Sequence, residues 1–243
     1  MQKRGQVTIF LVVGILLLII FGGILFLTSK VQKNSIIQKE LPLSLELRDK
    51  VKYYVENCVQ ETAVPGIYLL AIQGGVIYPD DPTKVLLTEN ALINYAYLNG
   101  VDQLFEVKME MDLNKYIQDT LIECIDDFSL FQEEGIIVSP QDEIKINSKI
   151  TSTSIIVDVL YNLKVQKGND TLTINTFSSK VNVPLRAIVE DAKEIINLQK
   201  DNSLVDFSRL SNLNSFVTVE PFDESTTLYT LTNNQSSFVD NPI

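Results

Sequence analysis

Residues 155–183 read IIVDVLYNLKVQKGNDTLTINTFSSKVNV, and the fold of the chain is decided in this stretch. Apolar and polar residues alternate along most of it. The alternation is interrupted by Lys-Gly-Asn-Asp at 167–170, a composition typical of a tight turn. A period of two residues indicates a strand with one buried face. Together with the apolar alternation at 144–150, the pattern predicts three successive strands in an antiparallel meander.

Helical periodicity precedes this sheet. Apolar residues recur at three- and four-residue steps over 45–62 and again over 112–128, so we expect each stretch to form an amphipathic helix. Pro65 should kink or restart the chain before a short apolar run at 67–72, because proline lacks the N–H that a helix interior requires. Between the two helices, short strands are expected at 84–87 and 92–98.

A second helical region follows the sheet. Pro184 ends the last strand, and the apolar spacing after it predicts a helix to about Lys200. A shorter helix is expected at 203–213, with two further strands at 216–220 and 227–232. Helices that cover one face of an antiparallel sheet make an α+β body, and this is the fold class that we expect after the N-terminal region.

An uncharged segment lies near the start of the chain. Residues 7–27 read VTIFLVVGILLLIIFGGILFL, which at 1.5 Å per helical residue would span roughly 31 Å, about the thickness of a bilayer core. We therefore expect a transmembrane helix over 7–28. The alternative is a buried core helix, but a helix apolar on every face needs more surrounding protein than 243 residues supply. A cleavable secretory signal has a shorter apolar core that ends at small residues, whereas this one ends at Leu-Thr-Ser-Lys.

Charge is divided unevenly along the chain. In total there are 31 acidic and 20 basic residues, for a net charge of -11, so the overall field repels a nucleic-acid backbone and we expect no nucleic-acid partner. Residues 1–40 are basic, which leaves 15 basic and 30 acidic residues in 41–243. Lys3 and Arg4 favour a cytoplasmic N-terminus at the cell membrane, with the lipid bilayer as a partner and the body on the extracytoplasmic side.

Histidine is absent from all 243 residues. This excludes Ser-His-Asp and Cys-His nucleophile systems, as well as His-ligated zinc and haem, so we predict no enzyme, no cofactor and no metal site. Adjacent carboxylates invite an acid–base interpretation, but sequence neighbours seldom face one another, and solvated surface charge is the simpler explanation. These pairs are Asp80-Asp81, Asp126-Asp127, Glu133-Glu134 and Asp223-Glu224.

Two features are candidates for ligand contact. Asp80 and Asp81 lie in a Pro-flanked loop that could bind a divalent cation weakly. Tyr95 and Tyr97 would project on the same face of a strand, where they serve either as an aromatic binding strip or as core packing.

Two covalent modifications are expected outside the cytoplasm. Cys58 and Cys124 are the only cysteines, and in an extracytoplasmic body they favour a disulfide; two buried free thiols are the alternative. Closing a loop of this length would contribute on the order of 4 kcal/mol in the chain-entropy model. Asn169 and Asn234 each begin a glycosylation sequon on an expected turn.

The first residues resemble a processing signal. Lys3-Arg4-Gly5-Gln6, followed at once by the apolar segment, resembles the class III signal peptides of archaeal type IV pilin-like proteins. That resemblance implies a prepilin-type peptidase as a partner, which would cut between Gly5 and Gln6 on the cytoplasmic side. One residue departs from the family pattern: filament-forming pilins usually carry a Glu five residues after the cut, where this chain has Phe10.

The body also resembles single-anchor proteins of small-genome archaea. The segments that carry this resemblance are 53–58, 73–75, 94–97 and the segment around Cys124. The resemblance implies no activity.

The sequence therefore predicts a chain in five regions: a basic head at 1–6, the apolar segment at 7–28, a juxtamembrane segment at 29–42, a mainly helical disulfide-tied region at 43–135, and a sheet with helices at 136–243. We expect a single-pass, membrane-anchored structural or interaction protein, a pilin-like or envelope component that contacts other envelope or pilus subunits. The alternative is an anchored binding module for a cation, peptide or sugar. A third class is an anchored hydrolase that uses only carboxylates.

Overall fold

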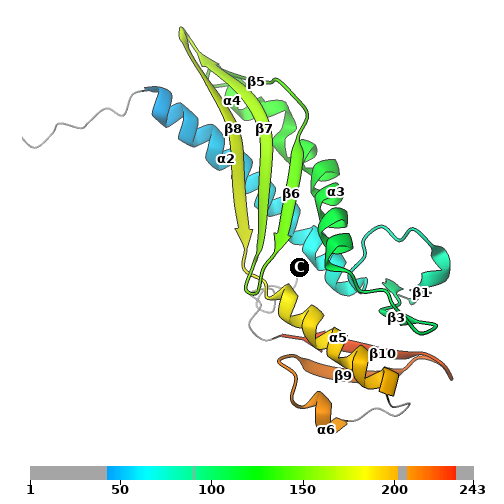
Figure 1. The fold of residues 1–243 in the computed structure, drawn as a ribbon. Helices are drawn as coiled ribbons and strands as arrows, with labels where there is room; N and C mark the ends of the chain where they lie inside the picture. Colours follow the sequence, from blue (N-terminus) through cyan, green and yellow to red (C-terminus); the bar gives the residue numbers. More distant parts are fainter. Residues whose placement is uncertain (1–42, 90, 202–206, 234–243) are drawn as a thin grey trace, which may run out of the picture. The chain divides into compact units, whose positions relative to one another are not determined.

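The computed structural model describes residues 43–89, 91–201 and 207–233 (Figure 1). These residues form helices and antiparallel sheets, so the described chain is α+β. The largest sheet and the two longest helices share one hydrophobic core, and the elements nearest the C-terminus have a second, smaller core.

The fold prediction is wrong about the transmembrane helix that it placed ahead of the body. In the described ranges the structure contains no helix with both the length and the hydropathy that a bilayer span requires. The longest helix, α2 (Leu43–Ile72), is amphipathic, because charged residues such as Lys52 and Glu56 alternate with its buried positions. The expected segments at 7–28 and 29–42 lie outside the described residues.

The central sheet is an antiparallel meander around one long strand. β7 (Ile155–Lys167) pairs along one edge with β8 (Asp170–Val181). Along its other edge it pairs with β6 (Lys145–Ile150) and, further along, with β5 (Ile136–Pro140). The three strands predicted from the alternation are confirmed, and β5 is an addition that the sequence did not predict as a strand.

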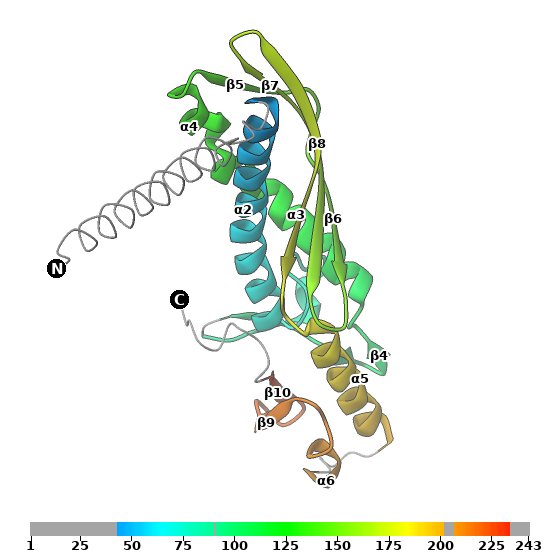
Figure 2. The same cartoon turned by 90° about the vertical axis from the view of Figure 1, so that its left-hand side faces the viewer.

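Two helices cover one face of this sheet, as the two views in Figure 1 and Figure 2 show. They are α2 and α3 (Glu106–Ile125), and their buried residues belong to the same core as those of the sheet. Core residues on the two helices and on β7 include Val55, Val59, Leu113, Ile117, Leu121, Val157 and Val159. The opposite face of the sheet is therefore free of these helices.

The second predicted helix is shifted toward the N-terminus. α3 begins at Glu106 instead of Asp112, and it ends at Ile125 instead of Phe128. The early end follows from the backbone: Asp126 adopts the left-handed conformation with φ 45°, which cannot continue a right-handed helix. Two short helical turns complete this region, η2 (Asp126–Phe128) and α4 (Ser129–Gln132).

α2 runs without a break through Pro65, where the sequence predicts a kink or a restart. A proline inside a helix costs about 3 kcal/mol or more in lost hydrogen bonding and steric strain. Ala63 and Ile67 on either side of it are buried in the main core, and we infer that this packing offsets the cost. The helix ends at Ile72: Gly74 follows with φ 70°, and the N–H of Gly75 donates to the Leu70 carbonyl at 2.7 Å.

Gly66 lies against α3. A Cβ at this position would be 2.7 Å from Cδ1 of Tyr116 and 2.9 Å from Cδ1 of the fully buried Leu113. An alanine gains about 1 kcal/mol in helix propensity, but overpacking costs about 1–3 kcal/mol. We therefore expect Gly66→Ala to lower the free energy of unfolding by about 1 kcal/mol, measured by urea denaturation of the full-length chain in detergent.

The matched control for that substitution is Gln60→Ala, an exposed change on the same helix. It should alter the free energy of unfolding by no more than about 0.5 kcal/mol. A Gly66→Ala variant that is more stable than the natural chain would contradict the close approach of the two helices.

Helix side chains meet both edges of the sheet. Asn114 of α3 accepts a hydrogen bond through Oδ1 from the backbone N–H of Ser148 on β6, at 2.6 Å. Glu56 of α2 accepts one through Oε1 from the N–H of Ser178 on β8, at 3.1 Å. Unpaired backbone N–H and C=O groups at a sheet edge can pair with a strand of another chain. These two hydrogen bonds occupy such N–H groups and so oppose edge-to-edge pairing.

Short strands connect the two long helices. β1 (Val85–Leu87) pairs with β2 (Leu92–Asn94), and β3 (Tyr97–Leu98) pairs with β4 (Val101–Asp102). The single-turn helix η1 (Pro82–Lys84) precedes them. The strand predicted at 84–87 is confirmed, whereas the one predicted at 92–98 is divided into β2 and β3.

The C-terminal elements have their own core. They are α5 (Leu185–Asp201), α6 (Phe207–Leu210), β9 (Phe216–Pro221) and β10 (Thr227–Thr232), and the two strands pair as a separate hairpin. The helix after Pro184 and both strands are confirmed, while the short helix predicted at 203–213 is only partly described. Ile195, Leu198 and Leu210 form the buried centre of this second core.

Candidate functional site

A disulfide joins the two long helices. Cys58 on α2 and Cys124 on α3 are bonded, with their Cα atoms 5.6 Å apart, so the predicted pairing is confirmed. Tyr54 supports the same junction, because its hydroxyl donates to the backbone carbonyls of Cys124 and Ile125 at 3.2 and 3.1 Å. Burial, aided by the nearby charges of Asp126 and Glu61, raises the pKa of Tyr54, so the hydroxyl stays protonated as the donor.

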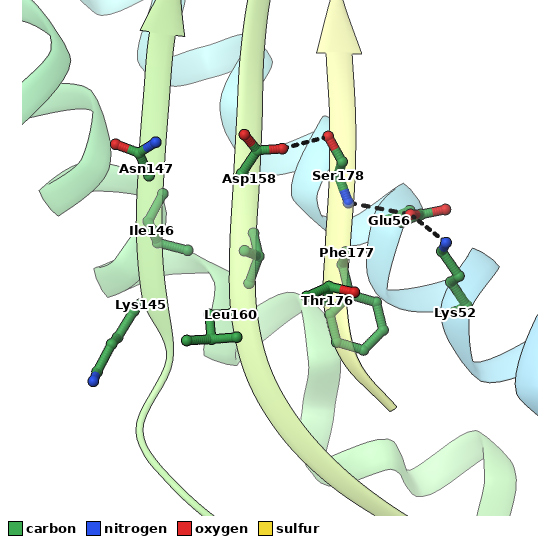
Figure 3. A pocket seen from close by; sticks show the side chains of 11 residues that line it. Lys52, Glu56, Lys145, Ile146, Asn147, Asp158, Leu160, Thr176, Phe177 and Ser178 are labelled. Carbon is green, nitrogen blue, oxygen red and sulfur yellow. Dashed lines mark hydrogen bonds and ion pairs between the residues drawn. The ribbon is translucent and has the colours of Figure 1, made fainter. Parts of the chain in front are cut away.

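A hollow lies on the outward face of the sheet, beside α2 (Figure 3). Its volume is about 450 Å³. The strands supply its floor and α2 closes one side with Lys52 and Glu56. Its polar lining from the strands comprises Lys145, Asn147, Asp158, Thr176 and Ser178, and Leu160 is the exposed apolar residue among them. A hollow with this lining suits a polar, charged partner.

Ser178 organises the carboxylates of this hollow. Its hydroxyl donates to Oδ1 of Asp158 at 2.7 Å, and its backbone N–H donates to Glu56 at 3.1 Å. Lys52 lies 3.7 Å from the same Glu56 oxygen. Glu56 and Asp158 are thus already engaged as hydrogen-bond acceptors, and among the lining residues the Ser178 hydroxyl is paired with the Asp158 carboxylate. The hollow presents charged and polar side chains at the surface.

Asp80 and Asp81 do not converge on a common point. Asp80 forms an ion pair with Lys108 at 3.0 Å, and Lys108 also pairs with the buried Asp112 at 3.0 Å. Asp81 accepts hydrogen bonds from the N–H and the hydroxyl of Thr83 at 2.9 and 2.7 Å, and these bonds lower the pKa of Asp81. Each carboxylate therefore serves its own local structure, the second as the cap of η1.

Lys108 forms ion pairs with both Asp80 and Asp112, which connect the loop at Asp80 to α3. Burial alone lowers the pKa of a lysine, yet the hydrogen bonds to Asp80 and Asp112 outweigh it, and the pKa of Lys108 is raised. Asp112 in turn accepts hydrogen bonds from the N–H groups of Ile77 and Tyr78 at 2.9 and 3.0 Å. In the described ranges no group of three or more Cys, Asp or Glu side chains is placed to hold a metal ion.

Tyr95 and Tyr97 do not lie on one continuous strand. Tyr95 follows the end of β2, and Tyr97 begins β3. Tyr97 packs against the main hydrophobic core, with Nζ of Lys200 5.6 Å from its ring centre. The strand that would have aligned the two rings is therefore interrupted between them.

The remaining predicted sites are covered only in part. Asn169 is exposed at the turn between β7 and β8, a position open to modification. Asn234, Gly5 and Gln6 lie outside the described residues.

The residues of the hollow were missed in the sequence prediction. These residues occupy the outward positions of strands in which apolar and polar residues alternate: Lys145, Asn147, Asp158 and Ser178. From the sequence alone, such outward polar residues are expected only to contact solvent. Their alternation with apolar residues was the one pattern that could have placed them together on one face of the sheet. What the sequence does not give is the pairing register, which places Asn147 beside Asp158 and Asp158 beside Ser178.

Comparison with known proteins gives no relative for this chain: no family model, no curated protein and no solved structure matches it.

Proposed function

We propose that the chain is an extracytoplasmic structural or interaction protein at the cell membrane, a pilin-like or envelope component. The observation that carries this proposal is the Cys58–Cys124 disulfide, because disulfides persist outside the cytoplasm and are rare within it. The hollow on the sheet adds support, since it offers charged and polar side chains for contact with a partner.

The membrane location rests on the sequence. Residues 7–27 are uncharged and apolar, and Lys3 and Arg4 precede them. The likeness of this head to class III signal peptides adds a prepilin-type peptidase as a proposed partner, together with the lipid bilayer and other envelope or pilus subunits. Cleavage between Gly5 and Gln6 is part of the same proposal.

Protease treatment of intact cells tests the proposed location. We expect the body of the chain to sediment with membranes and to be digested from outside, while a cytoplasmic marker protein stays intact until the cells are lysed. Mass spectrometry of the N-terminus should give a first residue at Gln6. A body that is protected until lysis would contradict the extracytoplasmic location, and an intact Met1 would remove the peptidase from the proposal.

An anchored binding module for a cation, peptide or sugar is the second candidate. The hollow of about 450 Å³ favours it, because this is within the usual range for ligand sites. Thermal-shift measurements with metal ions, peptides and oligosaccharides distinguish the binding module from the structural protein. A binding module should be stabilised by one of these ligands, and Asp158→Asn should abolish that stabilisation.

A further inference from the structure

We propose that the outward face of β6, β7 and β8 binds a second copy of this chain through that copy's acidic segment, residues 119–134. The inference rests on the proposed structural function and names the partner of its contact surface. Four lines of observation lead to it: the charge of the sheet face, the charge of the segment, their exposed apolar residues and their placement in the fold.

The sheet face is basic although the whole chain has a net charge of -11. The pairing register places Lys149 beside Ile156, and Ile156 beside Lys180. Four residues along β7, Lys145 lies beside Leu160, and Leu160 lies beside Thr176. Lys164 continues the outward positions of β7, so lysines surround Ile156, Asp158 and Leu160. We call this surface the basic sheet face: Lys145, Lys149, Lys164 and Lys180, with Ile156, Asp158 and Leu160 between them.

Within the described ranges these lysines have no carboxylate partner. All four are exposed, and no carboxylate in the described part of the chain lies within ion-pair distance of any of them. Asp158 is the one carboxylate at the described outward positions of these strands, and it already accepts the Ser178 hydroxyl. The positive charge of the face is therefore available to a partner.

The acidic segment is the matching surface. Residues 119–134 contain no Lys or Arg, and all of their carboxylates are exposed. Glu134 is paired with Lys50, and the other carboxylates have no ion-pair partner in the described ranges. Those carboxylates are Asp119, Glu123, Asp126, Asp127 and Glu133.

Each surface also exposes apolar side chains. Leu160 is 45% exposed within the basic sheet face. Ile122 and Leu130 are 57% and 61% exposed within the acidic segment. Specific interfaces combine exposed apolar side chains with charged ones, so the two surfaces match in both properties.

The two surfaces cannot meet within one molecule. Leu113, Ile117 and Leu121 of α3 share the core with the inward residues of the sheet, whereas the lysines of the basic sheet face occupy exposed, outward positions of the strands. The contact must therefore be between molecules, and it joins two different surfaces. Such a heterologous contact leaves one free surface of each kind at the ends, and it extends into an open array when the geometry does not close a ring.

Sedimentation velocity of the full-length chain in detergent tests the contact. We expect concentration-dependent association at about 50 mM salt, with the apparent affinity falling on the order of tenfold at about 500 mM salt because charges are screened. A chain that stays monomeric at low salt, or that associates more strongly as salt is added, would overturn the proposal.

Charge reversal identifies the surfaces. Lys145→Glu/Lys180→Glu on the sheet face and Glu123→Lys/Glu133→Lys in the acidic segment should each weaken self-association on the order of tenfold or more. An equimolar mixture of the two variants should regain the affinity of the natural chain, because opposite charges face each other again. Arg48→Glu/Lys84→Glu is the matched control, a charge reversal of the same size at exposed positions elsewhere, and it should not reduce association.

The equimolar mixture distinguishes the loss of a contact from misfolding, because two misfolded variants would not regain self-association when they are mixed. Failure of the mixture to associate, or an equal loss in the control variant, would overturn the proposal. Binding of poly-glutamate by a chain that does not self-associate would also overturn it, by showing that the occupant is a different acidic partner. None of these results bears on the extracytoplasmic location, which the protease experiment tests separately.

Discussion

Loss of the Cys58–Cys124 disulfide is expected to lower the free energy of unfolding by about 4 kcal/mol, the largest effect that we predict for any local change. The bond closes a loop of 66 residues, and opening it restores conformational entropy to the unfolded chain. It also frees α2 and α3 from each other at the end of α3. Urea denaturation of Cys58→Ala/Cys124→Ala, in the full-length chain and in detergent, measures the loss.

The control for that variant is the natural chain under reducing conditions. Because Cys58 is buried, its replacement by alanine also removes a small amount of packing, and the reduced natural chain lacks only the bond. The two should agree within about 1 kcal/mol. A reduced chain that unfolds at the same urea concentration as the oxidised chain would show that the bond does not stabilise the fold.

Asp191→Ala should produce the second largest effect, a loss of about 3 kcal/mol in the C-terminal elements. The carboxylate of Asp191 is buried on α5, and it accepts the N–H and the hydroxyl of Ser215 at 2.8 and 2.6 Å. It also accepts the N–H and the amide group of Asn214 at 3.3 and 3.2 Å. Without it, the buried donors of Ser215 lose their partner, and an unsatisfied buried donor costs about 1–3 kcal/mol.

Hydrogen exchange shows where the effect of Asp191→Ala falls. We expect faster exchange in β9 and β10, and unchanged protection in β7 and β8, because these strands belong to separate cores. The neighbouring Glu190→Ala is the matched control, since Glu190 is exposed. Equal exchange rates in the two variants would contradict the role of Asp191 as the anchor of the hairpin.

Local patterns were sufficient for much of the fold. The hairpin of β7 and β8 was predicted because the alternation and the Lys-Gly-Asn-Asp turn lie in one continuous stretch. The helix after Pro184 was predicted in the same way. The disulfide followed from the presence of only two cysteines on two amphipathic helices.

Features that depend on distant residues were not predicted. α2 continues through Pro65 because of packing on both sides of it, which no local propensity reveals. The hollow on the sheet depends on the contact of Glu56 with Ser178, which lie 122 residues apart in sequence. It also depends on the register of β7 and β8, which shifts at an irregularity between Leu160 and Leu163.

The redox state of the cysteines in living cells tests the proposed function most directly. Cells are quenched in acid, free thiols are alkylated, and the chain is analysed by mass spectrometry with and without reduction. We predict that Cys58 and Cys124 are protected from the reagent until the sample is reduced, as a bonded pair in an oxidising compartment would be. Alkylation of both cysteines without reduction would place the body among reduced proteins and contradict the extracytoplasmic function.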